Sequence, residues 1–405
     1  MGIISSLFQP PTMRADMNSA EMREMLRGGE ATASGVHVTA DNALTFSAVF
    51  ACCRVLAEGV AALPWITYRR TTRGKDRAPD HSLYPLLHDG PNSDMTSIAF
   101  RTALMFNANL WGNGYAEIVL DGAGRVTEMW PLLSRHMEAL ERDAAGVLIY
   151  PYRDPVKGLI KFPAWRIFHV MGPSLDGLNG LTPVKLHRQA IGLGLAEEHF
   201  GARFFGNGAR PGIALKHPGT LSDTAYGHLI ESWEEKHGGV ENAHRMAILE
   251  EGMELETFGV PPEDAQFLQS RKFQVEEIAR IYRVPPHLIG DMEHATFSNI
   301  EQQSLEYVTY TLQPWLAAFE QATQKRLLLE RERRDIFTEM LVDGLLRGDI
   351  VARYGAYNIA RNIGVLNADE IRAKENMNPE EGGAGAAYWR PMNMSDAREA
   401  MNNAQ

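Results

Sequence analysis

Two proline-bounded helices on either side of a polar loop, within residues 261–328, constrain the fold of this chain most strongly. Pro262 suits the first turn of a helix because it has no N–H to leave unpaired. Apolar residues then recur at helical spacing as far as Tyr282. Pro285 and Pro286 end that helix, since the residue before a proline is forced out of the helical region. The stretch predicts two long helices joined by a loop, and it lacks the features of a catalytic pocket.

The second helix is predicted to begin at Ser298, which can form a capping box with Glu301, and to run to about residue 328. At about 1.5 Å per residue it is roughly 45 Å long. Pro314 lies inside it and is predicted to kink it, because the proline ring removes a backbone hydrogen bond and clashes with the preceding turn. A rigid, bent pair of helices of this kind indicates a mechanical part.

Charge and cysteine content narrow the function classes. The 405-residue chain has 40 Lys and Arg against 51 Asp and Glu, a net charge of −11. That charge argues against tight nucleic-acid binding by the whole surface, which needs cations to replace phosphate counterions, but it permits transient contact.

The two cysteines, Cys52 and Cys53, are adjacent, so we expect buried free thiols and synthesis in a reducing cytoplasm. No apolar run approaches the roughly 20 residues of a membrane span, so no membrane partner is expected.

The order of the predicted elements indicates an α+β fold. Helices and strands occur in separate runs in the first half, and helices dominate the second half. A small insert with a helix and short strands lies between the two longest helices. The expected elements are helices at 42–63, 96–111, 182–205, 222–237, 337–347, 350–362 and 367–376, and strands at 65–70, within 115–172, and at 213–216, 246–250 and 253–258.

The glycine-rich and acidic segments carry no recognisable catalytic motif. Gly206-Asn207-Gly208 lacks the third glycine at dinucleotide-binding spacing and follows a helix instead of opening one. The chain also lacks the P-loop, the HExxH zinc motif, the GxSxG nucleophile motif and CxxC. We therefore expect no enzyme activity, no cofactor and no metal site.

Long runs of sequence resemble the phage portal protein family, in the short form found in long-tailed phages and gene transfer agents. The resemblance covers the chain from about Ser34 to Met394. One departure is Ser82, where the family often has proline, and it affects only a local turn. The matching runs include FSAVFACCRVLAEGVAALPWITYRR (46–70), HSLYPLLHDGPN (81–92), LWGNGYAEI (110–118), residues 177–215, EEIARIYRVPPHLIGD (276–291), TFSNIEQQSLEYVTYTLQP (296–314) and residues 345–379.

The resemblance implies a homo-oligomeric ring, usually a dodecamer, at one vertex of a capsid. The ring would conduct double-stranded DNA during packaging and ejection, binding it weakly and without sequence preference. The implied partners are the terminase large subunit, the major capsid protein and the head–tail adaptor protein. The ring would assemble in the bacterial cytoplasm and remain in the virion or phage-like particle. The alternative is a structural scaffold of the capsid or tail that does not conduct DNA.

The resemblance also divides the chain into the parts of a portal fold. These are an α+β wing, a two-helix stem, a small α/β clip, a long kinked helix and a helical crown. The implied boundaries are an N-terminal arm at 1–40, the wing at 41–180, stem helix 1 at 181–208, the clip at 209–260, stem helix 2 at 261–284, the tunnel loop at 285–299, the long kinked helix at 300–334, and the crown and C-terminal tail at 335–405.

A channel that conducts DNA must bind the duplex only weakly, because each phosphate neutralised by Lys or Arg adds affinity. The tunnel loop fits this requirement, since it has no Lys or Arg. Loop histidines are often exposed and inert. Stem cations often form intersubunit salt bridges or lie on a solvated helix face, and the clip helix can be an ordinary amphipathic helix. With those alternatives open, the candidates are His287, Asp291, Met292, Glu293, His294, Thr296, Phe297 and Asn299 facing DNA; Lys185, Arg188, Arg271 and Lys272 for weak phosphate contact; Ser222, Glu231, Trp233, Glu234 and Glu235 at the clip interface; and Pro314 at the kink.

Overall fold

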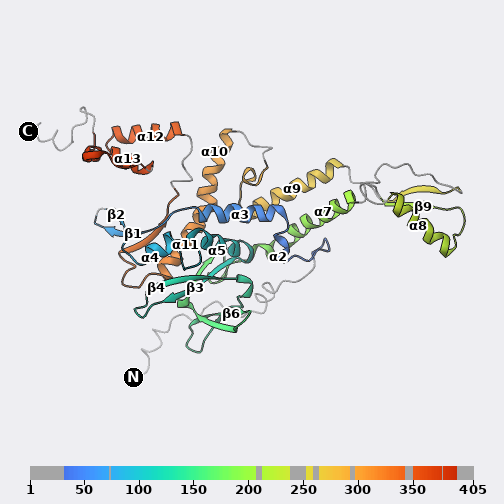
Figure 1. Cartoon of the computed structure of the whole chain (residues 1–405), viewed down its shortest axis with the longest axis horizontal. Helices are drawn as coiled ribbons and strands as arrows, with labels where there is room; N and C mark the ends of the chain where they lie inside the picture. Colours follow the sequence, from blue (N-terminus) through green and yellow to red (C-terminus); the bar gives the residue numbers. More distant parts are fainter. Residues whose placement is uncertain are drawn as a thin grey trace, which may run out of the picture. The chain divides into compact units, whose positions relative to one another are not determined.

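The computed structural model describes residues 32–72, 74–206, 212–237, 252–258, 264–291, 297–342, 350–375 and 377–389. These residues form two compact units, one ending at Met340 and the other beginning at Leu341. Both contain helices, and the first also contains four small antiparallel sheets, which confirms the α+β class (Figure 1). Within the described residues, no helix has the length and apolar character needed to cross a bilayer.

Two packed helices form the centre of the first unit. Helix α3 (Ser47–Ala61) lies against α5 (Ser97–Trp111), and both cysteines of α3 are fully buried (Figure 1). The nearly all-round apolar sequence of α3 predicted this burial. A separate short helix, α2 (Ala40–Ala43), precedes α3, so the single helix expected from residue 42 is interrupted. The short α4 (Leu83–His88) completes this group.

One three-stranded sheet joins residues that are far apart in the sequence. Strand β1 (Trp65–Thr71) pairs antiparallel with β2 (Gly74–Arg77) on one side and with β11 (Ile336–Met340) on the other. The prediction of a helix from residue 337 is wrong over this strand, and residues 343–349 lie outside the described ones. Burial alternates along β11 with the two-residue period of a strand.

Strand β11 lies just after residue 335, the implied start of the crown, and the crown boundary stays a prediction. Because β11 pairs with β1, the chain belongs to the first unit as far as Met340. Tyr68 of β1 stacks on Phe337 of β11, with ring centroids 5.7 Å apart. This cross-strand contact supplies the packing that a local helix pattern does not reveal.

Two further sheets confirm the strands expected between residues 115 and 172. The first has the order β4-β3-β8, and the second has the order β5-β6-β7. Tyr115, Tyr150, Phe162 and Ile167 form part of their shared apolar core. The strands are β3 (Asn113–Leu120), β4 (Val126–Leu132), β5 (Glu141–Arg142), β6 (Leu148–Asp154), β7 (Gly158–Pro163) and β8 (Ile167–Met171).

The last helix of the first unit, α11 (Gln313–Arg326), is fixed firmly on the sheets. It packs on β8 and β11. Its Phe319 meets Trp65 edge to face at 5.6 Å between ring centroids and lies 6.3 Å from Phe168, and all three rings are almost fully buried. Aromatic side chains of this size dominate the energy of a core, so α11 is a rigid support.

The second unit consists of short helices held by polar contacts. Helices α12 (Ile350–Asn362) and α13 (Ala368–Lys374) confirm two of the expected C-terminal helices. Arg353 of α12 donates hydrogen bonds of 2.7 and 3.0 Å to the two carboxylate oxygens of Glu375, a bidentate pair that joins the helices. Asn367 and Glu370 form the capping box that begins α13.

Candidate functional site

The two predicted stem helices lie side by side. Helix α7 (Arg188–Gly206) contacts α9 (Asp264–Tyr282), as Figure 1 shows. The helix expected over 182–205 is two helices, because α6 (Pro183–Leu186) ends at His187 before α7 begins. A Cβ on Gly201 would lie 3.1 Å from a ring carbon of Phe267, so a glycine at this point allows the two helices to approach closely.

The beginning of α7 meets the end of the predicted N-terminal arm, of which residues 1–31 lie outside the described ones. The backbone N–H of Ala33 donates a 2.9 Å hydrogen bond to the side chain of Gln189. Thr32 is buried, and a Cβ on Gly192 would lie 2.7 Å from its methyl group. A second glycine of α7 therefore makes room for a segment that is remote in sequence.

Polar contacts between the stem helices involve one of the predicted phosphate contacts. Arg271 lies 3.7 Å from the carboxylate of Glu198 on α7. Ser270 donates a hydrogen bond to Glu197 one residue earlier on α7. The alternative expected for a stem cation was an intersubunit salt bridge, whereas this pair lies within one chain. It reduces the charge that Arg271 can offer to a phosphate.

The remaining predicted phosphate contacts lie on three different helices, α6, α7 and α9. Lys185 lies on α6, and burial lowers the pKa of its ammonium group. Arg188, at the first position of α7, donates a 3.4 Å hydrogen bond to the Lys185 carbonyl. Lys272 is half-buried on α9. The four cations therefore do not form one cluster, and phosphate contact by any of them stays a prediction.

The predicted clip contains a helix flanked by two strands. Strands β9 (Gly212–Lys216) and β10 (Glu254–Phe258) pair antiparallel, whereas the expected partner of β10 at 246–250 lies outside the described residues. The hydroxyl of Ser222 accepts a 3.3 Å hydrogen bond from the Ala225 N–H and so caps α8 (Asp223–His237). Glu231 is exposed and Trp233 half-buried, while the side chains of Glu234 and Glu235 lie outside the described ones.

Helix α9 ends in a backbone motif that reverses the chain. The N–H of Val284 donates to the Ala279 carbonyl at 2.9 Å, and the N–H of Arg283 donates to the Arg280 carbonyl at 3.1 Å. Arg283 has a φ of 55°, the left-handed conformation that glycine usually takes at this position of a Schellman motif. Pro286–Ile289 then forms a short 3-10 helix, so the first part of the predicted tunnel loop is an ordered turn.

The structure describes only part of the predicted DNA-facing set. His287 and Asp291 are half-buried at the start of the turn, while Met292, Glu293, His294 and Thr296 lie outside the described residues. Phe297 and Asn299 lie on α10 (Phe297–Glu306), although their side chains are not described. The predicted cap at Ser298 is wrong, because the helix already begins at Phe297.

The long helix contains an irregular turn that sequence periodicity did not reveal. Between α10 and α11, residues Tyr307–Leu312 form a π-helical turn, and the Gln313 N–H donates to the Val308 carbonyl five residues earlier. Pro314 follows at once, in the first turn of α11. Proline offers no N–H to the Tyr310 carbonyl, so an α-helical ladder cannot continue unbroken through this point. The kink angle predicted at Pro314 stays a prediction.

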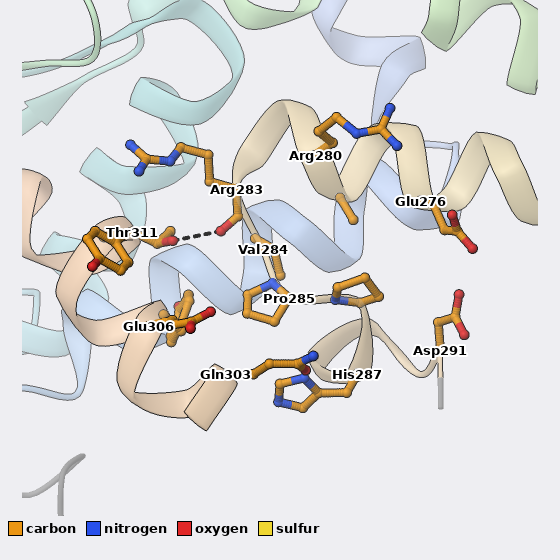
Figure 2. A pocket seen from close by; sticks show the side chains of 14 residues that line it. Glu276, Arg280, Arg283, Val284, Pro285, His287, Asp291, Gln303, Glu306 and Thr311 are labelled. Atoms are coloured by element: carbon orange, nitrogen blue, oxygen red, sulfur yellow. Dashed lines mark hydrogen bonds between the residues drawn. The ribbon is translucent and has the colours of Figure 1, made fainter. Parts of the chain in front are cut away.

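A cavity of about 520 Å³ lies between the end of α9, the turn after it and the π-helical turn. Figure 2 shows Pro285 and His287 on one wall and Gln303 and Glu306 on the facing wall. The hydroxyl of Thr311 donates a 2.7 Å hydrogen bond to the Arg283 carbonyl across the cavity. The ionisable lining groups are Glu276, Arg280, Arg283, His287, Asp291, Glu306, Tyr307 and Tyr310.

Sequence reasoning missed Arg280 and Arg283, which the chain reversal brings to the start of the predicted tunnel loop. Arg280 forms a salt bridge with Glu277 on the same helix. The two prolines that follow were the available signal, because they fix where α9 must end and therefore which residues border the loop. The lining carries both signs of charge, which suits weak contact better than a strong anion site.

Burial shifts the pKa values of both cysteines and of one histidine among the described residues. Burial raises the pKa of Cys52 and of Cys53 to about 12, so both thiols stay protonated and unreactive at neutral pH. Burial also lowers the pKa of His169 to about 3. No group of three His, Cys, Asp or Glu side chains with the geometry of a metal site is found among the described residues.

Comparison with known proteins gives consistent matches. The family model described as phage portal protein matches residues 47–376. The probable portal protein of Streptomyces phage phiC31 is 33% identical, covering 92% of this chain and 83% of its own length. The portal protein of Enterobacteria phage HK97 is 34% identical, and the match covers 84% of this chain and 80% of that protein. Among solved structures, one match is a chain from the neck of an empty gene transfer agent particle, computed with C6 symmetry. Its TM-score is 0.56 at 26% identity, and the match covers 82% of this chain and 90% of that chain.

Proposed function

The chain belongs to the phage portal protein family and is a component of a virion or phage-like particle, and we propose that its copies close into a ring that conducts double-stranded DNA. The supporting observation is the family match over residues 47–376, because it spans both stem helices, the turn between them and the long helix. The cyclic symmetry of the related neck supports a ring, which we expect to be dodecameric. The proposed location is one vertex of the capsid.

The charges near the proposed channel favour weak contact with DNA. Affinity for duplex DNA rises with each phosphate that a cation neutralises, and it then falls steeply as salt is added. Residues 285–299 contain no Lys or Arg. Among the cations close to them, Arg280 is paired with Glu277 and Arg283 is exposed at the end of α9, and farther along α9 Arg271 is paired with Glu198. Each copy therefore offers few cations to the phosphates, and a duplex can slide past.

The parts of the fold have distinct proposed partners. Helices α7 and α9 form the stem around the channel. The clip, with β9, α8 and β10, contacts the terminase large subunit during packaging and the head–tail adaptor afterwards. The first unit contributes the wing, which meets the major capsid protein, and the second unit is the crown. In this scheme ATP hydrolysis belongs to the terminase, and the chain acts as a structural component of the particle.

Electron microscopy of the purified protein tests the conduit. We expect rings with an axial channel wide enough for B-form DNA. Assemblies without an axial opening would support the alternative of a scaffold that does not conduct DNA. The rings should also bind duplex DNA weakly, with binding lost between 50 and 200 mM salt, roughly the range over which a few phosphate contacts are screened. Tight binding at the higher salt would contradict the sliding mechanism.

A nucleotide-hydrolysis assay tests the separation of roles. The purified rings alone should release no phosphate from ATP, and hydrolysis should require the terminase. Turnover by the rings alone, retained through further purification, would show that the chain is itself an enzyme.

A further inference from the structure

The two halves of the long helix are supported very differently. Helix α11 packs on β8 and β11 and carries the buried ring of Phe319. Helix α10 has its main contacts with the π-helical turn that follows it. The direction in which α10 presents its residues is therefore set by that turn and by whatever holds the turn in place.

Two side-chain hydroxyls hold the π-helical turn. Tyr307 donates a 3.0 Å hydrogen bond to the Val55 carbonyl of α3, and Thr311 donates a 2.7 Å hydrogen bond to the Arg283 carbonyl. Both residues are buried. Thr311 thus supplies a partner to a carbonyl at the end of α9 that the helix itself leaves unpaired.

A glycine on α3 leaves room for the tyrosine. A Cβ added to Gly59 would lie 2.7 Å from the Tyr307 hydroxyl oxygen and 3.3 Å from a methyl carbon of Leu312. Both neighbours belong to the π-helical turn, so α3 is shaped to receive the turn in this one register. Cys52 and Cys53 on the same helix are buried and inert.

We propose that Tyr307, Thr311 and Gly59 position α10 by holding the long helix in its π register. This inference rests on the proposed function, because α10 directly follows the segment expected to face DNA. A π-helical turn holds one more residue than an α-helical turn, and such turns often occur at functional sites. Conversion to an α register would rotate α10 by about 100° and shift it by about 1.5 Å, the increment of one residue.

The hydroxyl of Thr311 can be removed without changing the shape of the side chain. Thr311→Val loses the donor, whereas Thr311→Ser keeps it. Gly59→Ala tests the tyrosine contact from the α3 side. Thr309→Val is the matched control, because Thr309 is an exposed residue of the same turn. Loss of one such hydrogen bond should shift the balance between the two registers about fivefold.

The test is a reconstruction of the rings formed by each variant, together with the DNA retained in assembled particles. Thr311→Val and Gly59→Ala should form normal rings with α10 turned or smeared about its axis, and their particles should retain less DNA than wild-type particles. Thr311→Ser and Thr309→Val should match the wild type. An unchanged α10 with full DNA retention in Thr311→Val would overturn the proposal. Rings that fail to assemble in Thr311→Val would also overturn it, since Thr311 would then be an assembly residue.

These outcomes are separate from those that test the conduit. If wild-type rings show no axial channel, the proposed function fails. The direction of α10 in Thr311→Val and Thr311→Ser still decides whether the hydroxyl sets the register.

Discussion

Gly112, at the junction between α5 and the segment that leads into α6, offers the sharpest test of the packing. It ends α5 with a φ of 78°, in the left-handed region. A Cβ there would lie 2.8 Å from the Gly180 carbonyl oxygen and closer still to that of Leu181. The facing segment cannot retreat freely, because Gly180 donates a 2.7 Å hydrogen bond to the Asn113 side chain and accepts one of 3.1 Å from it.

The expected cost of Gly112→Ala has two parts. An alanine in the left-handed region costs about 1–2 kcal/mol. Displacing the segment at Gly180 breaks two hydrogen bonds with Asn113, at about 1 kcal/mol each, and loosens packing around them. The total loss in the free energy of unfolding should be about 3–5 kcal/mol, which is large against the marginal stability of a typical domain.

A second glycine separates the conformational cost from the cost of displacing the facing segment. Gly158 in the β6–β7 turn has a φ of 77°, and a Cβ there would meet nothing within 4 Å. Gly158→Ala should therefore show the conformational cost alone, about 1–2 kcal/mol. Denaturant unfolding of both variants gives the comparison. If Gly112→Ala loses no more stability than Gly158→Ala, the close approach at the junction is not real and the reasoning fails.

Three further substitutions test other contacts. Burial and, to a smaller extent, the charge of Glu339 raise the pKa of Glu320, so its contribution to stability is full at low pH and declines as the pH rises through that pKa. Glu320→Gln keeps an acceptor for the Met340 N–H and should be more stable than the wild type at pH 8 but not at pH 4. A difference in melting temperature that stays the same at pH 4 and pH 8 would contradict this. Arg283→Gly should raise the free energy of unfolding by about 0.5 kcal/mol in thermal unfolding, because the relief of left-handed strain exceeds the entropy that a glycine loses on folding. A loss of stability would argue against strain at this position. Arg101 is buried and donates hydrogen bonds to the Ser97 and Leu63 carbonyls. Arg101→Met should therefore lower the free energy of unfolding by about 2 kcal/mol in denaturant unfolding. A neutral result would mean that the desolvation cost of the guanidinium cancels those hydrogen bonds.

The helices were predictable because their signals are local. The apolar sequence of α3 predicted its burial, and Pro285 and Pro286 predicted the end of α9 within three residues of Tyr282. Helix α8 follows Ser222 as its cap predicts. Each of these features depends on residues within a few positions of one another, which is the range over which helical hydrogen bonds and caps act.

Pairings across long separations were not predictable. Strand β11 was expected to be helical, because its partner β1 lies about 270 positions earlier and nothing local announces the pairing. Strand β10 pairs with β9, which precedes it by a whole helix. The same limit hid the π-helical turn, whose hydroxyls bond to Val55 and Arg283 on other helices. Tertiary contacts override local propensity at these places.

The DNA-facing and phosphate-contact roles stay predictions, although the structure places several of these residues. His287 and Asp291 border the cavity between the end of α9 and the π-helical turn. Arg271, expected as a weak phosphate contact, lies 3.7 Å from the carboxylate of Glu198 on the facing helix, so its role as a phosphate contact stays a prediction. Sequence spacing places a cation on a helix but does not reveal the carboxylate that a neighbouring helix brings to it.

The central claim is that DNA passes along the axis of a ring of these chains. A reconstruction of the ring-bearing vertex in DNA-filled particles, without imposed symmetry, tests it most directly. We expect continuous duplex density through the channel, bordered by the segment that joins α9 to α10. An axis closed by protein, or DNA that enters the shell elsewhere while the channel stays empty, would contradict it.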